Sequence, residues 1–209
     1  YKLEYDIHPA HSSDLFQWKY LSENSGFYSD MDILFIKPIQ ETYEKFAKPK
    51  HDIVIPFEGG SSRVFPIGFI GSSGDNRFFK DLYSLSVRII KEDIRKNKYN
   101  KTGADAIGML LGSVDELSAH PALINRKYPE CNLSILPMHI VYPFPWWNDA
   151  ARFGHTGWQI RERYEVHHEA IGIHWYAGSK EAQRYNGKLN EDNYTSYDNT
   201  ICRYARLTA

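Results

Sequence analysis

The decapeptide FYSDMDILFI, residues 27–36, carries two aspartates between two apolar stretches. Both ends are typical of β-strands, because aromatic and β-branched side chains are enriched there. In extended chain, residues i and i+2 project to the same side, so Asp30 and Asp32 are expected to face one way. Two neighbouring carboxylates repel each other unless a proton or a cation lies between them. Mg²⁺ or Mn²⁺ fits such a pair, since both ions prefer oxygen ligands and keep positions open for phosphate oxygens.

The segments around this decapeptide indicate strands mixed with helices. Before it, Ser12 and Ser13 offer an N-cap for a helix that is expected to end at residues 24–26. Further strands are expected over residues 1–6, 52–56, 66–71, 133–137, 139–142 and 170–175, a loop over 59–62, helices over 75–98 and 104–111, and an aromatic turn over 143–147. This mixture predicts a single α/β domain over residues 1–209, with a polar tail from residue 181 whose order the sequence does not define.

Bulk composition narrows the class of protein. The chain has 209 residues, of which 42% are hydrophobic and 24% charged, as in an ordinary globular protein. Its net charge of −1 gives no reason to expect nucleic acid as a partner. The sequence contains no apolar run long enough for a membrane span. Cys131 and Cys202 match no metal-binding pattern, so they are expected to be unpaired thiols.

A D-x-D triplet alone fits solvated loop carboxylates as well as a metal site, so its context decides. The segments SDLFQWKYL (13–21), NSGFYSDMD (24–32) and KPI (37–39) follow one another at a spacing that resembles the signature of the DXD-containing glycosyltransferases. Two later segments, ILPMHIVYP (135–143) and IHWYAGSK (173–180), resemble further elements of this family. The resemblance, to a glycosyltransferase family 32-like group, implies a GT-A-type α/β fold with a mixed sheet flanked by helices. It also implies transfer of a sugar from a UDP- or GDP-linked donor to a saccharide or other acceptor, with retention.

The resemblance assigns roles to individual residues. It implies that Asp30, Asp32 and His174 bind Mn²⁺ or Mg²⁺ on the donor diphosphate, and that Asp14 and Asp32 are catalytic. It places the donor against Asp14, Gln17, Tyr28, Ser179 and Lys180. Structural alternatives stay open for three of these residues: a first-turn acid favoured by the helix dipole for Asp14, a core histidine for His174, and surface charge for Lys180.

The chain departs from the family pattern at three positions. Gln17 stands where the family has Arg, Ser25 where it has a second Gly, and Lys180 where it has Trp. The family's first strands would precede Tyr1, so the chain is expected to lack part of the nucleotide-binding half or to be a fragment. A non-catalytic sugar- or nucleotide-binding relative is therefore the second hypothesis. A metal-dependent phosphohydrolase or nucleotidyltransferase is the third.

Two further motifs each have a functional and a structural interpretation. His167, His168 and Glu169 have a spacing that suits no standard metal site, so a solvated turn is expected there. Trp146 and Trp147 could stack on an acceptor sugar, but core packing is the favoured prediction.

A cytoplasmic location is expected if the N-terminus is genuine, and the Golgi lumen if an anchor precedes it.

Overall fold

A computed structural model of the chain describes residues 7–40, 53–57, 65–93, 101–112, 124–148, 152–153 and 165–208. The expected strand at 1–6, the expected loop at 59–62 and the expected helix end at 94–98 lie outside this part. The fold is mixed α/β, with a mixed sheet flanked by helices. The chain divides into two compact units, the first of Tyr1–Ser29 with Tyr43–Pro137, the second of Asp30–Thr42 with Met138–Ala209. The single domain stays a prediction.

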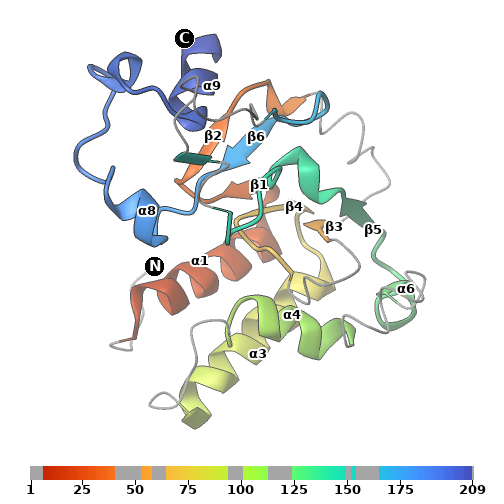
Figure 1. The fold of residues 1–209 in the computed structure, drawn as a ribbon. Helices are drawn as coiled ribbons and strands as arrows, with labels where there is room; N and C mark the ends of the chain where they lie inside the picture. Colours follow the sequence, from red (N-terminus) through yellow and green to blue (C-terminus); the bar gives the residue numbers. More distant parts are fainter. Residues whose placement is uncertain are drawn as a thin grey trace. The chain divides into compact units, whose positions relative to one another are not determined.

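The first unit is built on a four-stranded sheet of order β1-β4-β3-β5 (Figure 1). Its strands are β1 (Ser25–Ser29), β3 (Ile53–Pro56), β4 (Phe69–Ser73) and β5 (Leu133–Leu136). Strand β4 pairs antiparallel with both β1 and β3, whereas β5 pairs parallel with β3. The strands expected near residues 52–56 and 133–137 are therefore confirmed, and the strand expected from Pro66 begins later, at Phe69.

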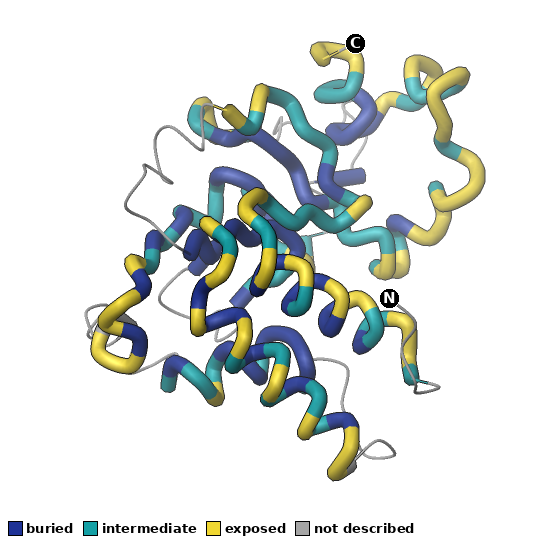
Figure 2. The backbone as a smooth tube through the Cα atoms, turned by 180° about the vertical axis from the view of Figure 1, so that it is seen from behind, coloured by how far each residue is buried: buried dark blue, intermediate teal, exposed yellow. Residues whose placement is uncertain are grey.

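Helices cover this sheet. They are α1 (Pro9–Glu23), α3 (Arg77–Asp93), α4 (Ala104–Leu111) and the short α6 (Ile124–Lys127). Helix α1 packs against β1, β4 and α3, and α3 packs against α4. One side of α1 is buried and the opposite side exposed, as Figure 2 shows. The core of this unit includes the buried side chains of Trp18, Leu21, Ile53, Ile55, Phe78, Phe79, Leu82 and Ile107.

The second unit holds a two-stranded antiparallel sheet of β2 (Ile33–Phe35) and β6 (Gly172–His174). Its other elements are the 3₁₀ helices η2 (Met138–Ile140) and η3 (Tyr194–Ser196), and the helices α8 (Lys180–Gln183) and α9 (Thr200–Thr208). Buried side chains of Phe144, Phe153, Ile173, Ala182 and Ile201 form its core. The tail from residue 181 therefore contributes to a packed core through Ala182 and Ile201.

The first helix begins earlier than the sequence predicts. Pro9 is its first residue, and the side chain of His8, the N-cap, accepts a hydrogen bond from the Ala10 N–H at 3.2 Å. Proline suits this position because its fixed φ is helical and its missing N–H would have no partner there. The N-cap prediction at Ser12 or Ser13 is therefore wrong. Asp14 consequently lies beyond the first turn, so the helix-dipole alternative for it is also wrong.

The strand expected over residues 139–142 is also wrong. The Val141 and Tyr142 amides both donate to the Met138 carbonyl, at 3.2 and 2.7 Å, which winds this segment into η2. The predicted helix over 104–111 and the helix end at Asn24 are confirmed. Cys131 and Cys202 are buried and are not joined in a disulfide, as expected. Within the described part of the chain, no helix combines the length and the apolar character that crossing a membrane requires.

Candidate metal centre

Three side chains of the second unit converge beside the β2–β6 sheet. His174 Nε2 lies 3.1 Å from Asp32 Oδ1 and 3.7 Å from Asp30 Oδ2. The candidate ligand atoms of all three residues lie within 4.8 Å of one another. We call these residues the acid–histidine group. The structure thus brings together the three residues that the sequence predicts as metal ligands.

The backbone register explains why the two segments meet. Ile33 is paired with His174 in the sheet, and the Trp175 amide donates to the Asp32 carbonyl at 3.0 Å. Asp32 itself lies in a turn that precedes β2, not in extended chain. The premise that a strand aligns the two carboxylates is therefore wrong. Strand pairing with a segment far along the chain brings His174 to them instead.

Asp32 is fixed by the segment that follows β6. The Ala177 N–H donates to Asp32 Oδ2 at 2.8 Å, which leaves Oδ1 facing His174. Tyr176, the residue before Ala177, has a φ of 53°, in the left-handed region. A left-handed conformation costs a non-glycine residue about 1 kcal/mol, and such strain is concentrated at functional sites.

Aromatic rings enclose His174. The rings of Tyr142 and Tyr176 lie 5.2 and 4.1 Å from it, centroid to centroid, and the residue is 7% exposed. The fully buried Arg152 guanidinium lies 4.8 Å from the Tyr176 ring centroid. It also donates to the Pro145 and Trp146 carbonyls at 2.7 and 3.0 Å. Arg152 and Tyr176 are functional candidates that the sequence did not reveal. No motif marks Arg152, and the resemblance of the segment 173–180 assigned no role to Tyr176.

The electrostatics favour charged forms of Asp32 and His174. Burial alone would raise the pKa of Asp32, but the hydrogen bond and charge of His174, with the Ala177 N–H, lower it below its ordinary value. Burial alone would lower the pKa of His174, but hydrogen bonds to Asp30 and Asp32 raise it above its ordinary value. Burial raises the pKa of the Tyr176 hydroxyl to about 12, so that group stays neutral.

The donor set fits a divalent cation. Adjacent ligands of an octahedral ion with bonds near 2.1 Å lie about 3 Å apart, close to the spacing of Asp32 Oδ1 and His174 Nε2. Two carboxylates suit Mg²⁺ and Mn²⁺, and the imidazole shifts the preference towards Mn²⁺. One usual feature is missing. His174 Nδ1 is buried and has no hydrogen-bond partner in the described part of the chain, whereas metal-bound histidines normally donate from their second nitrogen.

The residues predicted to bind the donor from the first unit have structural partners of their own. The Thr102 hydroxyl donates to Asp14 Oδ2 at 2.8 Å, and both residues are buried. Gln17 is 1% exposed, and its Nε2 donates to the Ile67 carbonyl at 2.8 Å. The Tyr28 hydroxyl lies 2.9 Å from Ser13 Oγ. Their donor-binding roles, and the catalytic role of Asp14, stay predictions.

Ser179 and Lys180 stand at the start of α8 in the second unit. Ser179 is the N-cap, and its hydroxyl accepts from the Ala182 N–H at 3.3 Å. Lys180 is exposed. Their proposed contacts with phosphate also stay predictions.

Trp146 and Trp147 do not pack into a core. Their exposed fractions are 65% and 60%, and their rings meet edge to face at a centroid distance of 5.9 Å. The core-packing prediction is therefore wrong. Arg152 donates hydrogen bonds to the backbone of this turn, while the two indoles are exposed.

Comparisons with protein-family models, with curated proteins and with solved structures gave no significant match.

Proposed function

We propose that the chain is a Mn²⁺- or Mg²⁺-dependent glycosyltransferase of GT-A-type fold, which moves a sugar from a UDP- or GDP-linked donor to a saccharide acceptor. The acid–histidine group carries this proposal. Two carboxylates and one buried imidazole converge from the same segments that resemble the DXD-containing family. The distance of 3.1 Å between Asp32 Oδ1 and His174 Nε2 is close to that of adjacent ligands on a divalent ion.

The chemistry of this group suits a diphosphate leaving group. A bound divalent ion would supply positive charge against the negative charge that develops on the departing nucleoside diphosphate. Asp30, Asp32 and His174 would hold that ion, and the Ala177 N–H keeps the Asp32 carboxylate oriented for it. Lys180, exposed at the start of α8, would add a second positive charge to the phosphates.

The exposed indoles of Trp146 and Trp147 support a saccharide acceptor. Aromatic faces bind the apolar faces of sugars, and both rings are available because neither is buried. Arg152 links this turn to the acid–histidine group, since it binds the Trp146 carbonyl and packs on Tyr176 beside His174.

A second candidate function is binding of a nucleotide sugar without transfer. It is favoured by Gln17, which stands where the family has Arg and is engaged with the Ile67 carbonyl. A buried amide at this position supplies no positive charge to the donor.

Release of nucleoside diphosphate from a panel of UDP- and GDP-sugars, with Mn²⁺ or Mg²⁺ and mixed saccharide acceptors, tests the proposal. We expect metal-dependent turnover that falls at least about 100-fold in Asp32→Asn, which removes one ligand charge at constant shape. Asp192→Asn is the matched control, because Asp192 is exposed in the same unit and belongs to neither the group nor its surroundings. Its turnover should equal that of the unchanged chain.

Three results would count against the transferase. Turnover retained in Asp32→Asn would remove the acid–histidine group from the mechanism. A thermal shift with Mn²⁺ and UDP or GDP, but no turnover with any donor, would favour the binding-only function. No thermal shift and no turnover with any nucleotide would reject both.

A further inference from the structure

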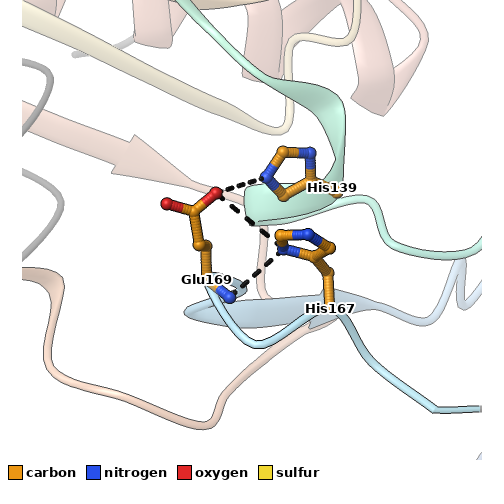
Figure 3. A group of neighbouring side chains, drawn as sticks. All are labelled: His139, His167 and Glu169. Atoms are coloured by element: carbon orange, nitrogen blue, oxygen red, sulfur yellow. Dashed lines mark hydrogen bonds and ion pairs between the residues drawn. The ribbon is translucent and has the colours of Figure 1, made fainter.

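A second group of potential ligands lies in the same unit, and two of its three residues stand outside the segments that resemble the family. His139, His167 and Glu169 form it, and we call them the histidine–glutamate group (Figure 3). His139 belongs to η2, whereas His167 and Glu169 flank the turn before β6. Glu169 Oε2 lies 3.3 Å from His139 Nε2 and 3.9 Å from His167 Nδ1. Figure 3 shows the three side chains pointing towards one another.

We propose that the histidine–glutamate group binds Zn²⁺ or a similar transition-metal ion at a site separate from the acid–histidine group. Two imidazoles and one carboxylate form a donor set that binds zinc in proteins and leaves a position open. With bonds of 2.0–2.1 Å, tetrahedral ligands lie about 3.3 Å apart. The distance of 3.3 Å between Glu169 and His139 matches this value. The distance of 3.9 Å between Glu169 and His167 exceeds it by about 0.6 Å.

The hydrogen bond to His167 supports a cation here. Its Nδ1 accepts a hydrogen bond from the Glu169 N–H at 3.2 Å, so this nitrogen carries a lone pair. The same nitrogen faces a Glu169 carboxylate oxygen, which is also an acceptor. Two acceptors that face each other are stabilised by a cation between them. A metal ion at Nδ1 would take the place of the Glu169 N–H.

The backbone holds the ligands in place before any ion binds. The Ala170 amide donates to the His167 carbonyl at 2.9 Å, which closes the turn, and the Lys37 ammonium donates to the His168 carbonyl. The Ile171 amide donates to the Ile140 carbonyl at 2.8 Å, which joins the turn to η2. The ligand segments are therefore tied together by hydrogen bonds on both sides of the group. A preformed site of this kind loses little entropy when it binds.

The metal preference of this group differs from that of the acid–histidine group. Imidazole ligands favour Zn²⁺, Co²⁺ and Ni²⁺, whereas carboxylates favour Mg²⁺ and Mn²⁺. The group is also more open, since His167 is exposed and His139 and Glu169 are partly exposed. An ion here would bridge η2 and the segment that leads into β6. This inference does not rest on the proposed transferase function.

Zn²⁺ titration followed by calorimetry, with Co²⁺ absorption as a signature of coordination geometry, tests the site. Because Zn²⁺ can also occupy the acid–histidine group, the titration uses the full chain in an Asp32→Asn background. We expect one Zn²⁺ per chain to remain in that background and to bind at least about tenfold more weakly after His139→Gln or Glu169→Gln. Melting in EDTA confirms that each variant is folded.

His168→Gln is the control, because His168 is the exposed neighbour in the same turn and is not among the converging ligands. Its Zn²⁺ affinity should equal that of the Asp32→Asn parent. Equal loss in His168→Gln would overturn the proposal, since it would mean binding to a histidine-rich surface and not to this group. Unchanged affinity in both His139→Gln and Glu169→Gln, or no Zn²⁺ binding in the parent, would overturn it as well.

Discussion

The acid–histidine group and the histidine–glutamate group lie in the same unit but are supported in different ways. His174 is 7% exposed, is enclosed by two tyrosine rings and is paired in a sheet. His139 and His167 lie on a 3₁₀ helix and a turn and remain open to solvent. The first group therefore depends on the packing of the unit, whereas the second depends on local hydrogen bonds. Similar ligand spacing does not imply similar stability or similar metal preference.

Among the variants that test this difference, Arg152→Ala is expected to have the largest effect on stability. The fully buried guanidinium makes two hydrogen bonds to the 145–146 turn and packs on Tyr176. Its loss should lower the free energy of unfolding by about 3 kcal/mol, because charged hydrogen bonds and buried volume are lost together. Mn²⁺ affinity should fall and Zn²⁺ affinity should not. Denaturant unfolding measures the change in stability, and metal titration measures the two affinities.

Arg184→Ala provides the control for that experiment. Arg184 is exposed and pairs with Glu181 at 2.8 Å, so its removal should cost no more than about 1 kcal/mol. If Arg152→Ala weakened both metal sites equally, the two groups would not be independent.

The next largest effect separates the two histidines directly. In EDTA, His174→Gln should destabilise the chain by about 2 kcal/mol, because it leaves space between two rings and removes the partner of Asp32. His139→Gln should change stability by less than about 0.5 kcal/mol, as is usual for partly exposed residues. Urea unfolding of the two variants side by side measures the two changes in stability. Equal losses of stability would show that His174 is no more dependent on packing than His139.

The pH dependence of the acid–histidine group is smaller, and its sign follows from its pKa shifts. The folded-state pKa of His174 is raised above 6.5, so its stabilising contribution is complete below 6.5 and is lost as pH rises through the raised value. The folded-state pKa of Asp32 is lowered below 3.8, so its contribution is present above 3.8 and is lost as pH falls through the lowered value. The metal-free chain should therefore lose stability on both sides of a mildly acidic window.

Mn²⁺ binding should show the opposite trend above that window. The ion competes with the proton on His174 Nε2, so Mn²⁺ affinity should increase as pH rises through the raised pKa of His174. Manganese titrations across the pH range check this expectation. In His174→Gln the increase should disappear, and its persistence would exclude His174 as a ligand.

The smallest effect is expected from Met31→Ala. Met31 stands between Asp30 and Asp32 in the sequence, yet its side chain is fully exposed, at 102%. Its truncation should change the free energy of unfolding by less than about 0.5 kcal/mol and leave Mn²⁺ affinity unchanged. A clear loss of affinity would show that the side chain, and not the turn backbone with the Ala177 N–H, positions the two carboxylates.

Much of the local structure followed from the sequence. The apolar runs at 52–56 and 133–137 predicted two strands of the mixed sheet, and the apolar pattern at 104–111 predicted a helix. Asp30, Asp32 and His174 were proposed together because their segments resemble one family signature, and the structure places them within reach of a single ion. The misplaced N-cap at Ser12 and the wrongly predicted strand at residues 139–142 arose where several backbone conformations suit the same residues.

The sequence by itself determined which side chains are available for metal chemistry and which local segments form strands or helices, because these properties depend on residue type and short-range periodicity. Only the tertiary structure decided which ligands meet. His139 meets Glu169 across 30 residues of sequence, and Asp32 faces His174 through strand pairing. No local pattern encodes either contact. Exposure was decided in the same way, since Trp146 and Trp147 face outwards while Arg152 is buried beneath their turn. Long-range contacts, not composition, fix these outcomes.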